Sequence, residues 1–174
     1  MKKTISIIII IAMCAMLASC GGVKNEVSDT EQPTLIDTMS LEEKVGQILF
    51  VRCVEDGQTD DLMSIKPGGI LMFGRDFEGL TKDEVKEKIQ SYQDKSDIPL
   101  IIGADEEGGT VVRVSSNPNL APEKFKSPQE IYNEGGMDAV VENATEKSEL
   151  LLNLGVNMNL APVADVSTNP SDYM

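Results

Sequence analysis

The stretch PLIIGADEEGGTVVR, residues 99–113, passes from an apolar run into three consecutive carboxylates, two glycines and an arginine. The apolar run is short and rich in β-branched residues, and this composition is typical of a buried strand. We therefore predict a strand that ends in a group of charged side chains.

Two interpretations of this acidic turn are open. Runs of charge usually begin a solvated loop, and residues 105–107 fit that description. Alternatively, the two glycines permit a reversal of the backbone, after which TVVR returns and brings Arg113 back toward Asp105 as a charge-assisted pair in a cleft. A carboxylate held in this way can accept two hydroxyl protons from a sugar. We expect Glu106 and Glu107 to be structural or solvent-facing.

The rest of the chain alternates between strand-like and helix-like segments. Apolar runs predict strands at 47–54, 70–74, 99–104 and 156–166. Helix starts are indicated by the capping-box spacings at Ser40 and Thr81 and by Ser127-Pro128. Further helical segments are predicted at 60–65 and 138–154, the latter with a stripe formed by Val141, Ala144, Ser148 and Leu151. Strands separated by helices favour a parallel sheet, either open and doubly wound or closed as a barrel.

Composition excludes several classes of function. The 174 residues carry a net charge of −14, which repels phosphate backbones and argues against a nucleic-acid partner. The chain contains no histidine, so imidazole chemistry and histidine-ligated zinc are absent from these residues. No glycine-rich phosphate-binding motif follows any predicted strand. We therefore expect no cofactor and no metal.

The amino terminus has the pattern of a secretory signal. Lys2 and Lys3 precede an apolar run over residues 5–18, which is too short to span a bilayer. Leu-Ala-Ser-Cys20 resembles the bacterial lipobox, so residues 1–19 are predicted to be a lipoprotein signal peptide and Cys20 the site of lipid attachment. An ordinary signal peptide with an incidental cysteine is the alternative. The polar segment 20–34 is predicted to be a flexible tether, which places the protein at the outer face of a bacterial cell membrane.

Three motifs together resemble a known family. ADEEGGTVVR is similar to the D-x-E-G-G-x-x-x-R motif of glycoside hydrolase family 3, in the branch that contains bacterial β-N-acetylglucosaminidases. PGGILMFGRDF at 67–77 and NMNLAPVADVSTNP at 157–170 resemble the second and fourth strands of that family with their following loops. The resemblance covers residues 35–174, and the D-x-x-H-G pattern of the β-glucosidase branch is not found.

The resemblance implies a (β/α)8 TIM-like barrel, of which residues 35–174 supply about the first four βα units. It implies hydrolysis of a β-N-acetylhexosaminide with retention of configuration. Asp105 and Arg113 would bind the sugar, or Arg113 would brace Asp105. Asp165 would support the site, although a strand-end carboxylate bound to backbone N–H groups fits it equally well. Arg75 and Asp76 are expected to form a surface pair, with a place on the rim of the cleft as the alternative.

No residue of this chain is predicted to be catalytic. In family members the nucleophile and the acid/base lie beyond the position that corresponds to residue 174, so we expect a truncated chain without glycosidase activity of its own. Two other functions stay open: a lipoprotein that binds a sugar or muropeptide without chemistry, and an inert barrel remnant that acts as a scaffold.

Overall fold

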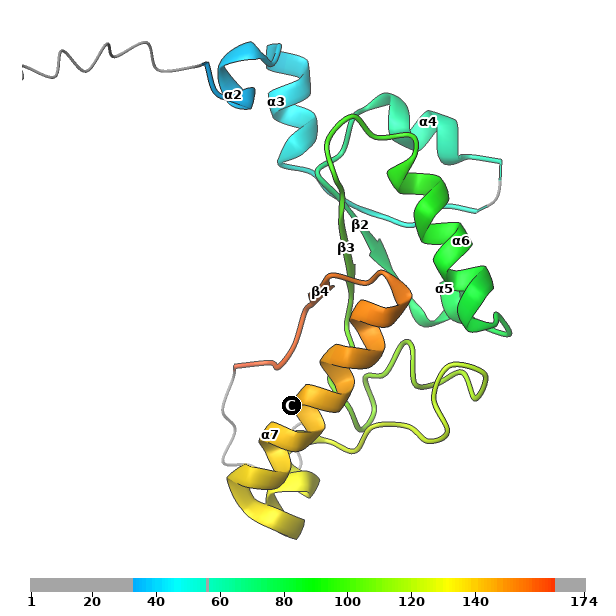
Figure 1. The fold of residues 1–174 in the computed structure, drawn as a ribbon, viewed down its shortest axis with the longest axis vertical. Helices are drawn as coiled ribbons and strands as arrows, with labels where there is room; N and C mark the ends of the chain where they lie inside the picture. The colour runs from blue at the N-terminus through cyan, green and yellow to red at the C-terminus, as the bar shows by residue number, and fades with distance from the viewer. Residues whose placement is uncertain (1–32, 56, 165–174) are drawn as a thin grey trace, which may run out of the picture. The chain divides into compact units, whose positions relative to one another are not determined.

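The computed structural model describes residues 33–55 and 57–164 (Figure 1). The helices are α2 (Leu35–Thr38), α3 (Leu41–Gln47), α4 (Thr59–Ser64), α5 (Gly74–Phe77), α6 (Lys82–Gln93) and α7 (Pro128–Leu154). The strands are β1 (Phe50–Arg52), β2 (Gly69–Met72), β3 (Ile101–Ala104) and β4 (Met158–Asn159). Within these ranges no helix combines the length and the apolar content that crossing a membrane requires. The predicted leader and Cys20 lie outside the described residues.

Side-chain caps start the helices where the sequence predicts them. The hydroxyl oxygen of Ser40 accepts a hydrogen bond from the N–H of Glu43, and the Glu43 carboxylate accepts one from the N–H of Ser40. The same reciprocal arrangement occurs at Thr81 and at Ser127. Each cap satisfies backbone donors that have no partner within the first turn of a helix. These three predictions are confirmed.

The four strands form one parallel sheet in the order β1-β2-β3-β4. The first strand is shorter than predicted, because α3 continues through Gln47. The side-chain amide of Gln47 donates to the carbonyl oxygens of Lys66 and Pro67, at 3.0 and 3.3 Å, which fixes the end of α3 beside the segment that enters β2. The predicted strand 47–54 therefore retains only Phe50–Arg52.

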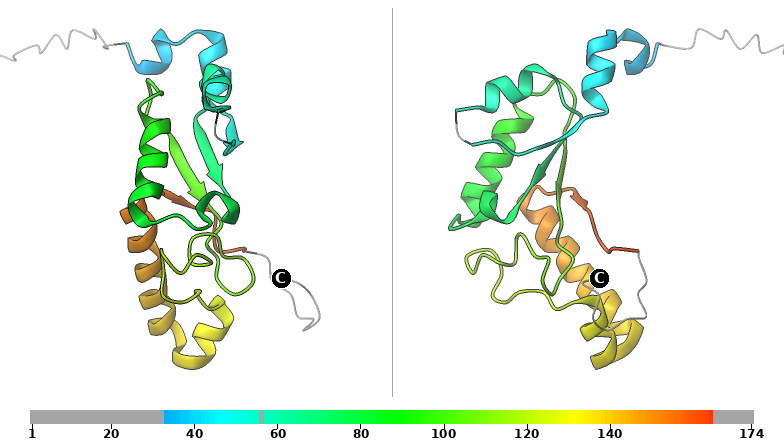
Figure 2. Two further views of the ribbon diagram at one scale, coloured as in Figure 1. Left: turned by 90° about the vertical axis from the view of Figure 1, so that its right-hand side faces the viewer. Right: turned by 180° about the vertical axis from the view of Figure 1, so that it is seen from behind.

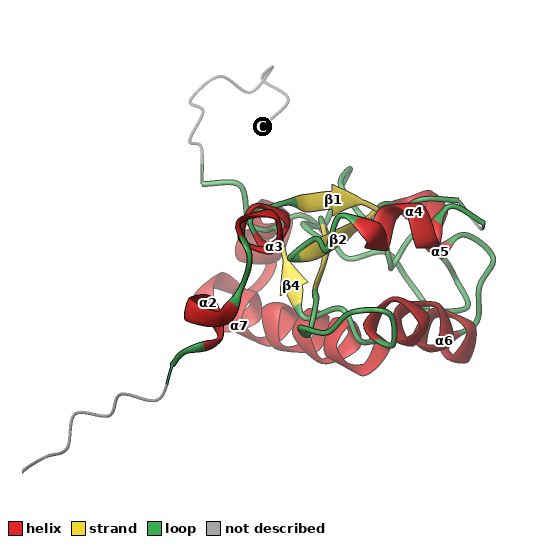
Figure 3. Ribbon diagram, turned by 90° about the horizontal axis from the view of Figure 1, so that it is seen from above, coloured by secondary structure: helices red, strands yellow, loops and turns green. Residues whose placement is uncertain are grey.

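One face of the sheet forms the core. Alternate residues on β2 and β3, namely Ile70, Met72, Ile102 and Ala104, are fully buried. They pack with side chains from three helices, which are Met63 of α4, Val85, Ile89 and Tyr92 of α6, and Leu151 and Leu154 of α7. Helices α6 and α7 lie along the same side of the strands (Figures 2 and 3). An open doubly wound sheet carries helices on both faces, so this arrangement favours the wall of a barrel.

The other face of the sheet carries the intervening residues and is more open. Phe50 and Ile101 on this face are 38% and 42% exposed. The ring of Phe50 crosses the sheet so closely that a Cβ atom on Gly69 or Gly103 would lie 2.5 Å from it. Glycine at both positions therefore lets the ring lie flat on the backbone. In a barrel this face lines the interior.

Helix α7 differs from its prediction in length and in its buried side. It begins at Pro128 and is kinked at Gly136, where φ is 68°. Its buried residues are Lys147, Leu151 and Leu154, whereas Val141 is 60% exposed. The predicted stripe is therefore wrong except at Leu151. Apolar residues on several sides of the helix give no unique face, so the sequence alone does not determine which side packs on the sheet.

Candidate functional site

The carboxyl ends of the first three strands bring four side chains together: Arg52 closes β1, Phe73 follows β2, Asp105 follows β3, and Arg113 returns to the same end. Side chains alternate between the two faces of a strand, so the first three continue the open face of the sheet. In parallel α/β folds, ligands bind where the carboxyl ends of strands meet loops.

Asp105 and Arg113 form the predicted ion pair. A terminal nitrogen of the guanidinium lies 3.1 Å from Oδ2 of Asp105, and about a quarter of each side chain is exposed, 24% for Asp105 and 26% for Arg113. The backbone reverses at Gly108 and Gly109, whose φ angles are 106° and 64°. A bridge between Gly108 and Val111 closes the turn. The interpretation as a merely solvated loop is therefore wrong for Asp105.

Glu106 is the buried centre of this turn. Its side chain is fully inaccessible to solvent. Its carboxylate accepts hydrogen bonds from the N–H groups of Arg113 and Val114 at 2.7 and 2.6 Å, and from the hydroxyl of Ser115 at 2.5 Å. The N–H of Ser115 adds longer contacts at 3.4 Å. These donors supply the hydrogen bonds that a carboxyl group buried away from water needs, which confirms the structural role expected for Glu106.

The backbone of the turn is attached to the neighbouring strand. The side-chain amide of Asn159 in β4 accepts a hydrogen bond from the N–H of Glu106 at 2.9 Å and donates to its carbonyl oxygen at 3.1 Å. One residue further, the carboxylate of Glu107 accepts from the N–H of Val163 at 3.0 Å. Both contacts connect the acidic turn to the segment that follows α7, so β4 and its loop support the site.

Lys147 of α7 contacts the turn from the core face of the sheet. Its ammonium donates to the carbonyl oxygen of Glu107 at 2.7 Å and lies 5.3 Å from the ring centroid of Phe125. Burial lowers the pKa of Lys147, and the charges of Glu106 and Glu107 oppose that shift. No sequence pattern indicates this role for Lys147, because a lysine in a helix ordinarily faces solvent.

The ring of Phe73 contacts two guanidinium groups. The central carbon of Arg52 lies 4.8 Å from the ring centroid, and that of Arg113 lies 5.7 Å from it. Both distances are in the range of cation–π contacts. The Nε atom of Arg113 is buried and has no hydrogen-bond partner among the described residues. Sequence reasoning missed Arg52 and Phe73, although the alternation Phe50-Val51-Arg52 at a strand end would have placed Arg52 on the site face.

Arg75 and Asp76 form the expected ion pair, but Asp76 is buried and does not lie on the surface. It is 6% exposed, and its Oδ2 accepts a hydrogen bond of 2.7 Å from the N–H of Phe73. Arg75 approaches its other oxygen at 3.7 Å. Asp76 thus fixes the backbone of Phe73 at the start of α5, and so it helps to place the ring in the site.

The described residues hold neither of the other predicted sites. Asp165 and Cys20 lie outside them, so their predicted roles stay predictions. Among residues 33–55 and 57–164, no group of three or more cysteines, histidines and carboxylates is arranged to hold a metal ion. Cys53 is buried in the core as predicted, 3.2 Å from the hydroxyl of Tyr92, and burial raises the pKa of its thiol.

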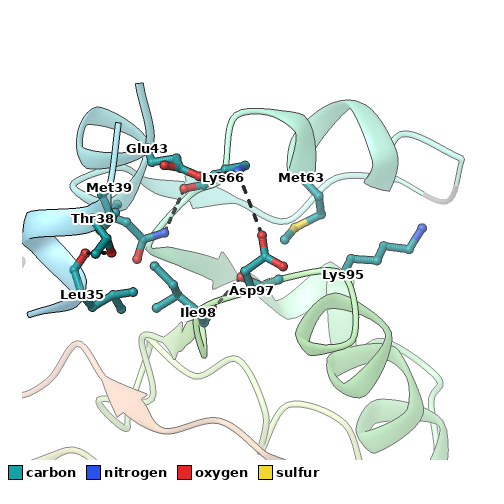
Figure 4. Close-up of a pocket in the computed structure, with 11 residues that line it drawn as sticks. Leu35, Thr38, Met39, Glu43, Met63, Lys66, Lys95, Asp97 and Ile98 are labelled. Carbon is teal, nitrogen blue, oxygen red and sulfur yellow. Dashed lines mark hydrogen bonds and ion pairs between the residues drawn. The ribbon is translucent and has the colours of Figure 1, made fainter. Parts of the chain in front are cut away.

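A cavity of about 250 Å³ lies among the segments that lead into the strands (Figure 4). It is lined by Leu35, Thr38, Met39, Glu43, Gln47, Met63, Lys66, Lys95, Ser96, Asp97 and Ile98. Lys66 joins its walls through ion pairs with Glu43 at 2.5 Å and Asp97 at 4.0 Å. The amino-terminal face of a barrel serves stability, whereas chemistry belongs to the opposite face. The candidate site is therefore the group at Asp105.

Comparison with known proteins identifies relatives. A model of the glycosyl hydrolase family 3 N-terminal domain matches residues 40–173. A β-hexosaminidase A from Pseudoalteromonas piscicida is 30% identical over 108 residues, which are 60% of this chain and 18% of that protein.

Two solved structures are also similar. A family 3 β-N-acetylglucosaminidase from Paenibacillus sp. str. FPU-7 shares 26% identity at a TM-score of 0.63, over 71% of this chain and 24% of that one. A fungal multi-domain β-N-acetylglucosaminidase of the same family shares 28% identity at a TM-score of 0.62, over 75% and 16%. This chain thus spans about a quarter or less of these relatives. It belongs to glycoside hydrolase family 3, and its four parallel strands are part of that family's TIM-like barrel.

Proposed function

We propose that Asp105 and Arg113 bind the sugar ring of a β-N-acetylhexosaminide, in a protein that hydrolyses this glycoside with retention. The observation that carries the proposal is the ion pair of 3.1 Å at the carboxyl end of β3. The relatives named β-hexosaminidase and β-N-acetylglucosaminidase support the choice of substrate.

Asp105 is suited to accept hydrogen bonds from the hydroxyl groups of a sugar. Its Oδ2 atom contacts Arg113, and its Oδ1 atom has no hydrogen bond to any described residue. The side chain is 24% exposed, so a ligand can approach the carboxylate. The guanidinium holds the carboxylate in one orientation, and charged acceptors form stronger hydrogen bonds to hydroxyl groups than neutral ones do. Asp105 would thus accept hydrogen bonds from two hydroxyl groups of the ring.

The surrounding residues would limit the freedom of this pair. The carboxylate of Glu106 fixes the backbone of Arg113 by accepting a hydrogen bond from its N–H group, and Phe73 supplies an apolar surface beside the guanidinium. A site held by buried contacts loses less conformational entropy when its ligand binds. Asp165 is proposed to support the same site from the end of the fourth strand. The part of this chain in the reaction would be binding, because no described residue is assigned as nucleophile or acid/base.

The decisive experiment measures N-acetylglucosamine binding by the full chain with NMR, which detects millimolar affinities. Asp105→Asn removes one charge at nearly constant volume and should weaken binding about tenfold or more, the loss expected for a charge-assisted hydrogen bond. Glu87→Gln is the matched control, since Glu87 is exposed on α6, which covers the other face of the sheet. An Asp105→Asn variant that binds as well as Glu87→Gln would contradict the proposal.

We also propose that Cys20 is lipid-modified and holds the protein at the outer face of a bacterial membrane. The support is the sequence Leu-Ala-Ser-Cys20 after the apolar run. Two acyl chains would give a stable anchor, because burial contributes about 0.8 kcal/mol per methylene. Mass spectrometry of the protein from membranes should find an acylated amino-terminal Cys20, and an intact Met1 or an unmodified Cys20 would contradict it.

A further inference from the structure

We propose that Arg52 binds a carboxylate carried by the sugar ligand, so that the site recognises an acidic sugar. The inference rests on the proposed function, because it takes the sugar to lie at Asp105 and Arg113. It adds a specificity-determining residue from a different strand and a chemical class for the ligand.

The first observation is that the Arg52 guanidinium has no anionic partner among residues 33–55 and 57–164. The residue is exposed at the end of β1, and its guanidinium contacts the ring of Phe73 at 4.8 Å. Within the described part of the chain it makes neither an ion pair nor a side-chain hydrogen bond. A cation–π contact consumes none of the N–H donors of the guanidinium. Those donors are therefore available to a ligand.

The second observation is the position of this guanidinium beside the sugar-binding pair. Arg113 lies 5.7 Å from the same Phe73 ring and reaches Asp105 at 3.1 Å. Asp105 is thus already paired with Arg113, and Arg52 adds a second guanidinium at the same aromatic ring. The chain has a net charge of −14, yet Arg52 has no anionic partner among the described residues.

The chemistry favours a carboxylate over the other groups that a sugar carries. Arginine presents a planar fork of donors that matches the two oxygens of a carboxylate. A phosphate also fits the fork, but it carries up to two negative charges and is repelled more strongly by the acidic protein. A neutral hydroxyl group gains less from a charged donor. A monoanionic sugar therefore suits the site best.

The test compares sugars that differ in one acidic group. The full chain, with a nonionic detergent to accommodate the apolar run at residues 5–18, is titrated by NMR with N-acetylglucosamine and with N-acetylmuramic acid. The second sugar has the same ring and acetamido group and adds a carboxylate on an ether at O3. Glucuronic acid and glucose form another pair, in which the carboxylate is at C6. The two pairs distinguish the positions from which a carboxylate reaches Arg52.

Three variants accompany the wild type. Arg52→Gln removes the charge and the fork, and Arg52→Lys keeps the charge without the fork. Lys86→Gln is the matched control, because it removes the same charge from an exposed position on α6, on the other face of the sheet. Circular dichroism of each variant verifies its fold.

We expect the wild type to bind at least one acidic sugar about threefold to tenfold more tightly than its neutral counterpart, as for a charge-assisted pair in partial contact with water. Arg52→Gln should abolish this preference, Arg52→Lys should retain part of it, and Lys86→Gln should keep it in full. A wild type without preference, or an equal loss in Arg52→Gln and Lys86→Gln, overturns the inference while the proposed function stands. Failure to bind N-acetylglucosamine at all contradicts both.

Discussion

Glu106 offers the most direct perturbation of the turn that carries the site. Glu106→Ala removes the acceptor of the N–H groups of Arg113 and Val114 and of the Ser115 hydroxyl, and Val114 is fully buried. A buried donor left without a partner costs about 1–3 kcal/mol, and the empty volume adds to this. We expect a total loss of about 3–5 kcal/mol in the free energy of unfolding. This is less than the sum of the separate costs, because some of the freed donors can bind water.

Two variants separate the carboxylate's contacts from its volume. Glu106→Gln keeps the size and one acceptor oxygen, so Arg113 and Val114 retain their partner, and the loss should be about 1 kcal/mol. Glu107→Ala is the control from the neighbouring position, where the carboxylate accepts one hydrogen bond among the described residues, from the N–H of the exposed Val163. It should also lose only about 1 kcal/mol.

The assay is urea unfolding followed by far-UV circular dichroism, because the chain contains no tryptophan. The Glu106→Ala midpoint should fall well below those of Glu106→Gln and Glu107→Ala, with an unchanged slope. A Glu106→Ala variant as stable as Glu107→Ala would show that water reaches the turn, and the argument that Glu106 positions Arg113 would fail.

Two further predictions concern the same turn. Because burial lowers the folded-state pKa of Lys147, the unfolded chain binds more protons between that pKa and about 10.5, so the Lys147 contribution to stability rises with pH in this window. Urea unfolding should therefore show that the stability of the wild type relative to Lys147→Met is greater at pH 10 than at pH 7. A difference in the free energy of unfolding that is constant, or that falls with pH, contradicts this. Gly108→Ala, with φ at 106° and a Cβ 2.1 Å from the Lys126 carbonyl oxygen, should lower stability by about 2–3 kcal/mol. Gly57→Ala, with φ at 93° in open space, should cost about 1 kcal/mol, and equal melting temperatures for the two would refute the steric argument.

Local chemistry made part of the fold predictable. The caps at Ser40, Thr81 and Ser127 depend on residues three positions apart, and the structure has all three. The return of Arg113 to Asp105 depends on two glycines between them, and it was predicted for the same reason. Interactions that close within a few residues are determined largely by the residues themselves.

Tertiary packing determined what the sequence could not predict. The run at 47–54 was divided between helix and strand because Gln47 bonds to carbonyl oxygens 19 and 20 residues away. Asp76 is charged and adjacent to Arg75, which suggests a surface pair, yet it is buried because it accepts the N–H of Phe73. Arg52 joins the site only because β1, β2 and β3 align in register. Such contacts are not visible along a single segment.

The measurement that tests the central claim most directly is a double-mutant cycle on N-acetylglucosamine affinity, with Asp105→Asn, Arg113→Gln and the combined variant. If the two side chains hold one sugar ring as a pair, each single change should weaken binding strongly and the second should add little, which gives a coupling of about 1–2 kcal/mol. Independent, additive losses, or no loss in either variant, would contradict the claim that this pair binds the sugar.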